Sequence, residues 1–251
     1  MLNPSPDITA AEQVRQDLAA LYRLAHHYGW TDITSTHISA RLPEDPQHYL
    51  LNSYDLMFDE ITASNLTRMS FEGGAVDDRP GSGKVINEAG HIIHSGILSA
   101  RPDINFVIHS HTRAGIAVSA MPDGLLPLSQ HAGFVLGTLS THPYQDSTKV
   151  ENEGALLASD LGTNFAMLLQ NHGLLAVGRT AAEAFAYHYF LEMACKVQVD
   201  ILSATDNPIT IDDDAMAALH EWGAPENGPH GDVQWPSLIR MLDRTVPEYR
   251  S

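Results

Sequence analysis

Short apolar runs between longer amphipathic patterns constrain the fold of this 251-residue chain more than any other feature. Residues 104–109, 166–170 and 174–177 are mainly apolar, lie near Pro, Asn or Gly, and have the length of strands buried in a sheet. Weaker strand patterns cover residues 33–40 and 49–52. Between them, apolar residues at helical spacing predict helices over residues 9–29, 87–100, 112–120, 147–161 and 180–204. Because helices and strands alternate, we predict an α/β fold.

Two of these helices begin with a capping box, at Thr9 and at Thr180, each followed three residues later by glutamate. Beyond residue 204 the composition shifts to Asp, Pro and Gly, and apolar residues return only near Trp235 and Leu242. We therefore predict one main domain over residues 1–204. Residues 205–251 should form a C-terminal extension, with a short helix that packs on the same domain or on a neighbouring subunit.

Two of the apolar runs end at histidines, and these histidines predict a metal site. In a strand, residues two apart point to the same face, so His109 and His111 can present both imidazoles to one ion. His172 follows the run 166–170 and would supply a third nitrogen. Three protein ligands leave a coordination position open, as in catalytic metal sites. The alternative is that these are ordinary histidines in a chain that carries 14 of them.

Charge and cysteine content limit the expected partners and the expected compartment of the protein. The net charge of −17 disfavours nucleic acid and anionic membranes, which need a basic face, so the expected partner is a small molecule. Cys195 is the single cysteine, which rules out an internal disulfide and suggests a reducing compartment. No apolar run approaches the roughly 18 residues of a membrane span, and the N-terminus is neither basic nor apolar. A soluble, cytoplasmic protein is expected.

With these motifs in place, residues 10–204 resemble the class II aldolase/adducin family. The resemblance rests on Gly29-Trp30-Thr31, His37-Ile38-Ser39-Ala40-Arg41, Phe58-Asp59-Glu60-Ile61-Thr62, Ala100-Arg101-Pro102-Asp103, Ile108-His109-Ser110-His111 and Gln170-Asn171-His172-Gly173-Leu174. It implies a three-layer α/β/α sandwich around a mixed, mostly antiparallel sheet, and a homotetramer with active sites between subunits. It also implies a divalent metal held by His109, His111 and His172, with zinc expected and manganese or iron as alternatives.

The chain departs from the family's sugar-phosphate aldolases at the residues that hold phosphate and move the proton. Thr36-His37 replaces a Gly-Asn pair, and residues 52–55 replace a second phosphate-holding turn. Glu88 and Ala89 replace paired serines, and the family's catalytic glutamate falls at Gly90. Since Asp55 would repel a phosphate, we predict a substrate that is not a sugar phosphate.

Four further residues are candidates for the site, each with a simpler alternative. Glu88 is either a substitute acid/base or a solvent-facing carboxylate. His37 either contacts substrate or is a structural histidine bonded to backbone. Arg113 either clamps a substrate carboxylate or pairs with one of the 31 acidic residues. His131 either reaches the metal cavity from a neighbouring loop or is a partly exposed histidine.

These observations leave three functions open. The leading one is a metal-dependent lyase that cleaves or decarboxylates a small, unphosphorylated, oxygenated acid. A three-nitrogen site with open positions also suits ferrous iron and dioxygen, so the second is a non-haem iron oxygenase. The third is a non-catalytic, adducin-like binding module, which the missing glutamate favours.

Overall fold

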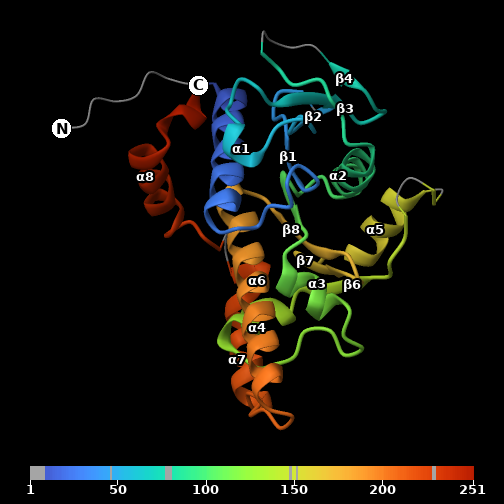
Figure 1. Ribbon diagram of the computed structural model, residues 1–251, viewed down its shortest axis with the longest axis vertical. Coiled ribbons are helices and arrows are strands. Elements are labelled where there is room, and N and C mark those ends of the chain that lie inside the picture. The colour runs from blue at the N-terminus through green and yellow to red at the C-terminus, as the bar shows by residue number, and fades with distance from the viewer. Residues whose placement is uncertain (1–8, 46, 77–80, 147–148, 151, 228–229) are drawn as a thin grey trace.

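A mixed sheet forms the centre of the computed structural model, which describes residues 9–45, 47–76, 81–146, 149–150, 152–227 and 230–251 (Figure 1). Within this part of the chain the sheet has eight strands in the order β4-β3-β2-β1-β5-β8-β7-β6. They are β1 His37–Arg41, β2 His48–Leu51, β3 Thr67–Ser70, β4 Ala75–Val76, β5 Phe106–Ser110, β6 Leu139–His142, β7 Ala166–Leu169 and β8 Gly173–Gly178. Only β6 and β7 pair in parallel; the other neighbours are antiparallel. The predicted mixed, mostly antiparallel α/β fold is confirmed.

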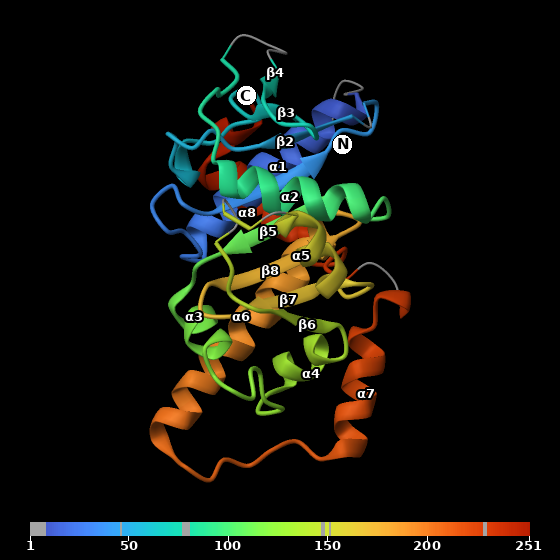
Figure 2. The same ribbon diagram turned by 90° about the vertical axis from the view of Figure 1, so that its right-hand side faces the viewer.

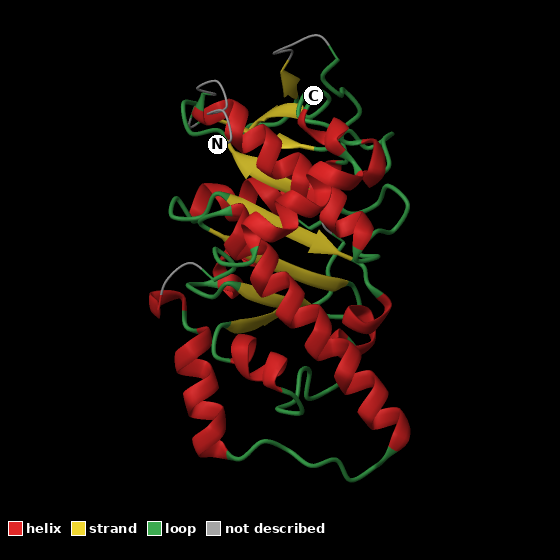
Figure 3. Ribbon diagram, turned by 90° about the vertical axis from the view of Figure 1, so that its left-hand side faces the viewer, coloured by secondary structure: helices red, strands yellow, loops and turns green. Residues whose placement is uncertain are grey.

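Helices cover both faces of the sheet. The described helices are α1 Ala10–His27, α2 Glu88–Ala100, α3 Arg113–Ser119, α4 Gln130–Leu136, α5 Glu153–Leu161, α6 Ala181–Ala204, α7 Asp213–Gly223 and α8 Trp235–Thr245, with short 3₁₀ turns at Phe58–Glu60, Pro225–Asn227 and Pro247–Arg250. Figure 2 shows α2 and α5 over one face, and Figure 3 shows the helices on the opposite face, where α1 and α6 lie. No described helix is long and apolar enough to cross a membrane.

Side-chain caps set the starts of several helices. Thr9 accepts a hydrogen bond from the backbone N–H of Glu12, and Thr180 accepts one from that of Glu183, as the capping boxes predicted. Asn87 caps α2 in the same way. The predicted helix over 147–161 is described only in part, because residues 147, 148 and 151 lie outside the described residues; the helix described in this segment is α5.

The sequence pattern missed helices α4 and α7 and strands β3, β4 and β6, and it began one strand too early. α4 starts at a Ser129 cap and packs against α7, where Gly133 and Gly223 let the two helices approach closely. The side chain of Asp212 caps the start of α7, and the negative charges of Asp213 and Asp214 in its first turn are favourable at the positive end of the helix dipole. From the sequence alone, these aspartates indicate only a shift in composition. The strand predicted over 33–40 begins only at His37, because Ile33 lies in a turn with φ of 52°.

The C-terminal extension packs on the same chain. Leu242 of α8 and Tyr249 are buried in one apolar cluster with α1, and Trp235 packs against that cluster. Figure 1 shows α8 beside α1, far from the loop that links α6 to α7. The end of the extension therefore completes the outer layer over α1, whereas α7 packs against α4.

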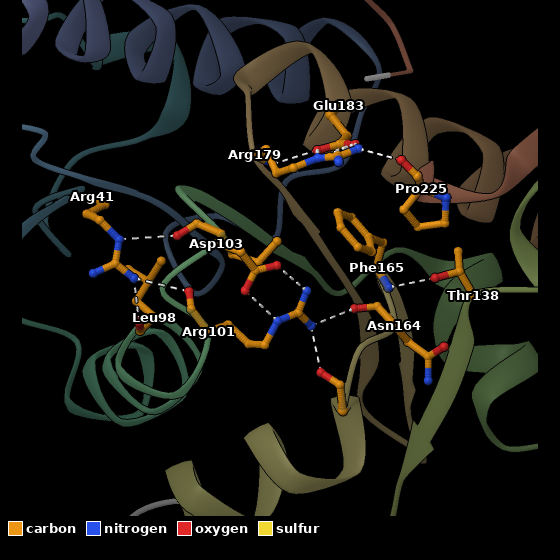
Figure 4. A network of polar contacts seen from close by, with 12 residues as sticks. Arg41, Leu98, Arg101, Asp103, Thr138, Asn164, Phe165, Arg179, Glu183 and Pro225 are labelled. Carbon is orange, nitrogen blue, oxygen red and sulfur yellow. Dashed lines mark hydrogen bonds and ion pairs between the residues drawn. The ribbon is translucent and has the colours of Figure 1, made fainter. Parts of the chain in front are cut away.

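Arginines bond the loops at the end of β5 that lies away from its histidines (Figure 4). Arg101 forms two hydrogen bonds with Asp103 and donates to the carbonyls of Gly162 and Asn164, at 2.6 and 3.1 Å. Arg179 pairs with Glu183, whose side chain is buried, within the first turn of α6. These bonds fix the loops at one end of the sheet, while the opposite end of β5 carries the candidate site.

Candidate metal centre

Three histidines converge at the C-terminal end of β5. His109 lies in β5, His111 follows it directly, and His172 sits in the turn between β7 and β8. The Nε2 atom of His111 lies 2.9 Å from the Nε2 atoms of both His109 and His172. The three possible ligand atoms lie within 4.8 Å of one another. The strand geometry thus brings together the three nitrogens that the sequence predicted.

Local backbone geometry makes this convergence possible. Asn171 adopts a left-handed conformation with φ of 55°, which turns the chain so that His172 faces β5. At Gly173 an added Cβ would lie 2.2 Å from the carbonyl oxygen of Ser110, so a side chain there would push β8 away from β5. Asn and Gly in this turn therefore place the third histidine beside the first two.

Hydrogen bonds to Nδ1, on the side of the ring away from the other histidines, orient two of the three rings. The Nδ1–H of His109 donates to the carbonyl oxygen of Leu174 at 2.9 Å, and Nδ1 of His111 lies 2.9 Å from Oδ2 of Asp32. Hydrogen bonds of this kind fix the ring and leave the Nε2 lone pair for a metal. Sequence reasoning missed Asp32, because its approach to His111 depends on the chain reversal after α1 and not on a local motif.

The donor set fits a divalent ion. Zinc is bound by imidazole nitrogen at about 2.0–2.1 Å, so tetrahedral ligand atoms lie roughly 3.3 Å apart. This value lies between the 2.9 Å of the two contacts made by His111 and the 4.8 Å within which all three atoms lie. Burial lowers the pKa of His109 well below its ordinary value and lowers the pKa of His172 to about 4. Both rings are therefore neutral near pH 7, which is the form that binds a metal.

His37 lies directly beside this centre. It is paired with His109 across β1 and β5, and the two ring centroids are 4.9 Å apart. Its Nδ1 lies 2.7 Å from Nε2 of His94, whose Nδ1 is in turn hydrogen-bonded to the hydroxyl of Ser39. Burial lowers the pKa of His37 well below its ordinary value and that of His94 to about 3. His37 thus belongs to a buried, hydrogen-bonded row of side chains that ends at the three-histidine cluster.

A side chain at position 90 would occupy the space that the ring of His37 fills. A Cβ added at Gly90 would lie 2.8 Å from Cδ2 of His37 and 3.1 Å from its Cγ and Nε2. The family resemblance places a catalytic glutamate at position 90, and here the imidazole of His37 lies against that position. Glu88, two residues earlier, is an exposed residue at the start of α2.

The remaining candidates lie outside the histidine cluster. Arg113 is exposed at the first position of α3, two residues after His111, and has no ion pair among the described residues. His131 lies in α4 and not in a loop, and its ring packs near those of Tyr189 and Phe190 on α6. Within this chain, His131 is thus not brought to the three-histidine cluster.

The turn that holds a phosphate in the family's sugar-phosphate aldolases has different hydrogen-bonding groups in this chain. The hydroxyl of Ser53 donates to Oδ1 of Asp55 at 2.6 Å, so this hydroxyl is already engaged by a carboxylate. Asp55 itself is exposed. The turn that would hold a phosphate therefore presents a negative charge.

A second group of polar side chains reaches the cluster from β6 and α5. His142 is buried between the carboxylates of Glu153 and Asp160, and a small cavity joins His142 and Glu153 to His172. Of these four residues only His172 was singled out from the sequence, since no short motif links the other three to it.

Comparisons with known proteins agree with this architecture. The family model described as Class II Aldolase and Adducin N-terminal domain matches residues 16–199. The crystal structure of an aldolase II superfamily protein from Pseudomonas syringae is 43% identical, with a TM-score of 0.89 and coverage of 97% of this chain and 98% of that one.

Of two further relatives, one is named as a sugar-phosphate aldolase and the other as an adducin. The L-fuculose 1-phosphate aldolase from Glaciozyma antarctica PI12 is 28% identical, with a TM-score of 0.85 and coverage of 98% of this chain and 97% of that one. Alpha-adducin from Rattus norvegicus is 35% identical over 276 residues, which span 100% of this chain but only 37% of the adducin.

Proposed function

Because the chain belongs to the class II aldolase and adducin family, we propose that it is a divalent-metal-dependent lyase acting on a small, unphosphorylated, oxygenated acid. The observation that carries this proposal is the convergence of three imidazoles, two of them oriented by hydrogen bonds to their Nδ1 atoms. A binding module has no need of three nitrogens that share one open point. The expected ion is zinc, with manganese or iron as alternatives.

The reaction class follows from what such a site stabilises. A bound divalent ion supplies a Lewis acid for the substrate oxygen on which negative charge develops. In retro-aldol cleavage or decarboxylation the breaking carbon–carbon bond leaves its electron pair on the carbon beside that oxygen. A proton later replaces the departed group on this carbon. Both reactions therefore suit one site.

The chain's own residues would orient the substrate. Nδ1 of His37 is bonded to His94, which leaves Nε2 as the nitrogen available to a bound molecule. Arg113 offers a guanidinium close in sequence to His111, and guanidinium is well suited to bind a carboxylate through two parallel hydrogen bonds. We therefore assign substrate contact to His37 and carboxylate binding to Arg113. A neighbouring subunit of a homotetramer would close the site.

The negative charge of Asp55 disfavours a phosphate group on the substrate. The relative from Glaciozyma antarctica is named for a sugar phosphate, but this chain places Asp55 in the corresponding turn and bonds Ser53 to it. A carboxylate beside a phosphate is repulsive and displaces the hydroxyl that would donate to it. An organic acid bound by Arg113 avoids that repulsion.

The test combines metal analysis with product detection. Protein purified without chelator is analysed for bound metals and assayed for oxygen uptake with ferrous ion. It is then incubated with a panel of 2-hydroxy and 2-oxo acids and with sugar phosphates, with His109→Ala as the inactive control. Zinc or manganese, no oxygen uptake, and cleavage or decarboxylation of an acid support the proposal.

Three other outcomes overturn it. Iron with oxygen uptake assigns the site to an oxygenase. Substoichiometric metal and no turnover point to a non-catalytic, adducin-like module. Preferred cleavage of a sugar phosphate refutes the argument from Asp55.

A further inference from the structure

A buried carboxylate beside the metal centre has only one of its two oxygens satisfied. Glu153, the first residue of α5, is 3% exposed. Its Oε1 lies 3.0 Å from Nε2 of His142, while its Oε2 has no hydrogen-bond partner among the described residues. A buried carboxylate oxygen without a partner is costly, so such an atom usually marks a bound water or ion.

His142 cannot satisfy the second oxygen. Its ring is buried at the end of β6, and its Nδ1 lies 2.7 Å from Oδ2 of Asp160, so both of its nitrogens are already paired with carboxylates. The carbonyl of His142 also accepts a hydrogen bond from the backbone N–H of Gln170, at 2.9 Å. That bond fixes His142 and Glu153 relative to the turn that carries His172.

The space between these residues is the size of one water molecule. A cavity of about 10 Å³ is lined by His142, Tyr144, Glu153, Gln170 and His172, with Ile93, Leu157 and Leu169 closing its apolar side. A buried water needs roughly 10–15 Å³ and two or more polar partners. The cavity supplies the volume, and Glu153 supplies an acceptor.

His172 is the metal ligand whose orientation is otherwise unexplained. His109 and His111 each have a partner for Nδ1, whereas Nδ1 of His172 has none among the described residues. Ligand histidines almost always donate this N–H to a carboxylate, a carbonyl or a water. His172 and Glu153 line the same cavity.

We propose that Glu153 is a positioning residue for the metal centre, which it reaches through one water molecule held in this cavity. The water accepts the Nδ1–H of His172 and donates a hydrogen to Oε2 of Glu153. His142 and Asp160 hold the carboxylate from the other side. All three ligand histidines are then oriented by the same device. The inference rests on metal binding in the proposed function, but not on the reaction or the substrate.

The test measures metal affinity in two variants of Glu153. Glu153→Met keeps the length of the side chain and removes both oxygens, whereas Glu153→Gln keeps one oxygen that can still hold a water. Zinc affinity is measured by competition with a chromophoric chelator. We expect Glu153→Met to weaken zinc binding about 10- to 100-fold, as losses of such supporting groups do, and Glu153→Gln to weaken it less.

Two control variants calibrate this result. Asp32→Ala removes the partner of His111 and should weaken zinc binding to a similar degree as Glu153→Met. Asp206→Asn changes an exposed carboxylate beyond the end of α6 and should leave the affinity unchanged. Urea unfolding of each metal-free variant separates a loss of affinity from a general loss of stability.

The crystal structure of the zinc-loaded wild-type protein gives a second, independent readout that does not depend on any variant folding. An ordered water within about 3 Å of both Oε2 of Glu153 and Nδ1 of His172 supports the inference. An empty cavity, a protein group on Nδ1, or unchanged affinity in Glu153→Met overturns it. So does a wild-type protein that binds no zinc. If zinc binds as expected but no acid is turned over, the proposed function fails while this inference stands.

Discussion

The contact between Gly90 and His37 can be tested by replacing the glycine with alanine. Gly90 lies in the first turn of α2 with helical backbone, so alanine is conformationally allowed there. Its Cβ would nevertheless lie 2.8 Å from Cδ2 of His37. The imidazole is held by the bond to His94 and is only 2% exposed, so it has little freedom to move aside. The cost of Gly90→Ala should therefore depend on His37.

The expected free energies follow from two opposing effects. In a helix, alanine is more favourable than glycine by up to about 1 kcal/mol. Overpacking a buried site by one methyl group costs about 1–3 kcal/mol. We therefore expect Gly90→Ala to lower the free energy of unfolding by up to about 2 kcal/mol in the wild type. In the His37→Ala background, where the ring is gone, the same change should raise it by up to about 1 kcal/mol.

Urea unfolding of the wild type, the two single variants and the double variant gives the coupling energy directly. The four proteins are followed by far-UV circular dichroism in the metal-free state, and equal m-values establish that one transition is compared. A coupling of about 1–3 kcal/mol is expected, because the overpacking cost exists only when both side chains are present. Additive effects, or stabilisation by Gly90→Ala in both backgrounds, would refute the reasoning.

Further predictions concern pH, the core and the metal. Burial lowers the pKa of His94 and His188 to about 3, so below pH 6.5 the unfolded chain binds more protons than the folded one. Stability should be full above pH 6.5 and should fall towards pH 3, by up to about 1.4 kcal/mol per pH unit for each histidine; denaturation at several pH values measures this, and His188→Gln should reduce the slope. Tyr22→Phe removes the buried hydroxyl that accepts hydrogen bonds from the backbone N–H groups of Ile38 and Asn52, and calorimetry should show a loss of about 2 kcal/mol or more. Zinc at about 100 times its Kd should stabilise the wild type by about 2.7 kcal/mol and His109→Ala far less; equal stabilisation of both would place the ion elsewhere.

The elements that carry the site could be predicted because each has a local signal. Thr9, Asn87 and Thr180 cap helices whose apolar residues repeat at helical spacing, and the apolar runs around His109 form buried strands. The alternation of side chains in a strand then places His109 and His111 on one face. The pairing of His109 and His111 thus follows from a rule that operates over a few residues, whereas His172 lies 61 residues beyond His111 and is predicted from its place after another apolar run and from the family resemblance.

The surroundings of the ligands could not be predicted, because they depend on contacts between distant segments. Asp32 reaches His111 across 79 residues of sequence, and His37 meets His94 across 57. Glu153 and His142 are closer in sequence, but their contact requires α5 to fold back over the end of β6. A turn at Ile33 sets the first of these approaches, and its sequence has no pattern as strong as a capping box.

The contact between His37 and Gly90 changes how the departures from the family are understood. From the sequence, the histidine in place of an asparagine and the glycine in place of a glutamate are two independent losses. In the fold they are one exchange, because the ring of His37 lies where a side chain at position 90 would begin. Gly90→Glu alone would therefore collide with His37 and could not restore the family's carboxylate. A site left without function would show a void at the deleted glutamate, whereas here the ring packs against that position and is hydrogen-bonded through His94 to Ser39. Such a filled, bonded replacement favours a rebuilt site over a decayed one.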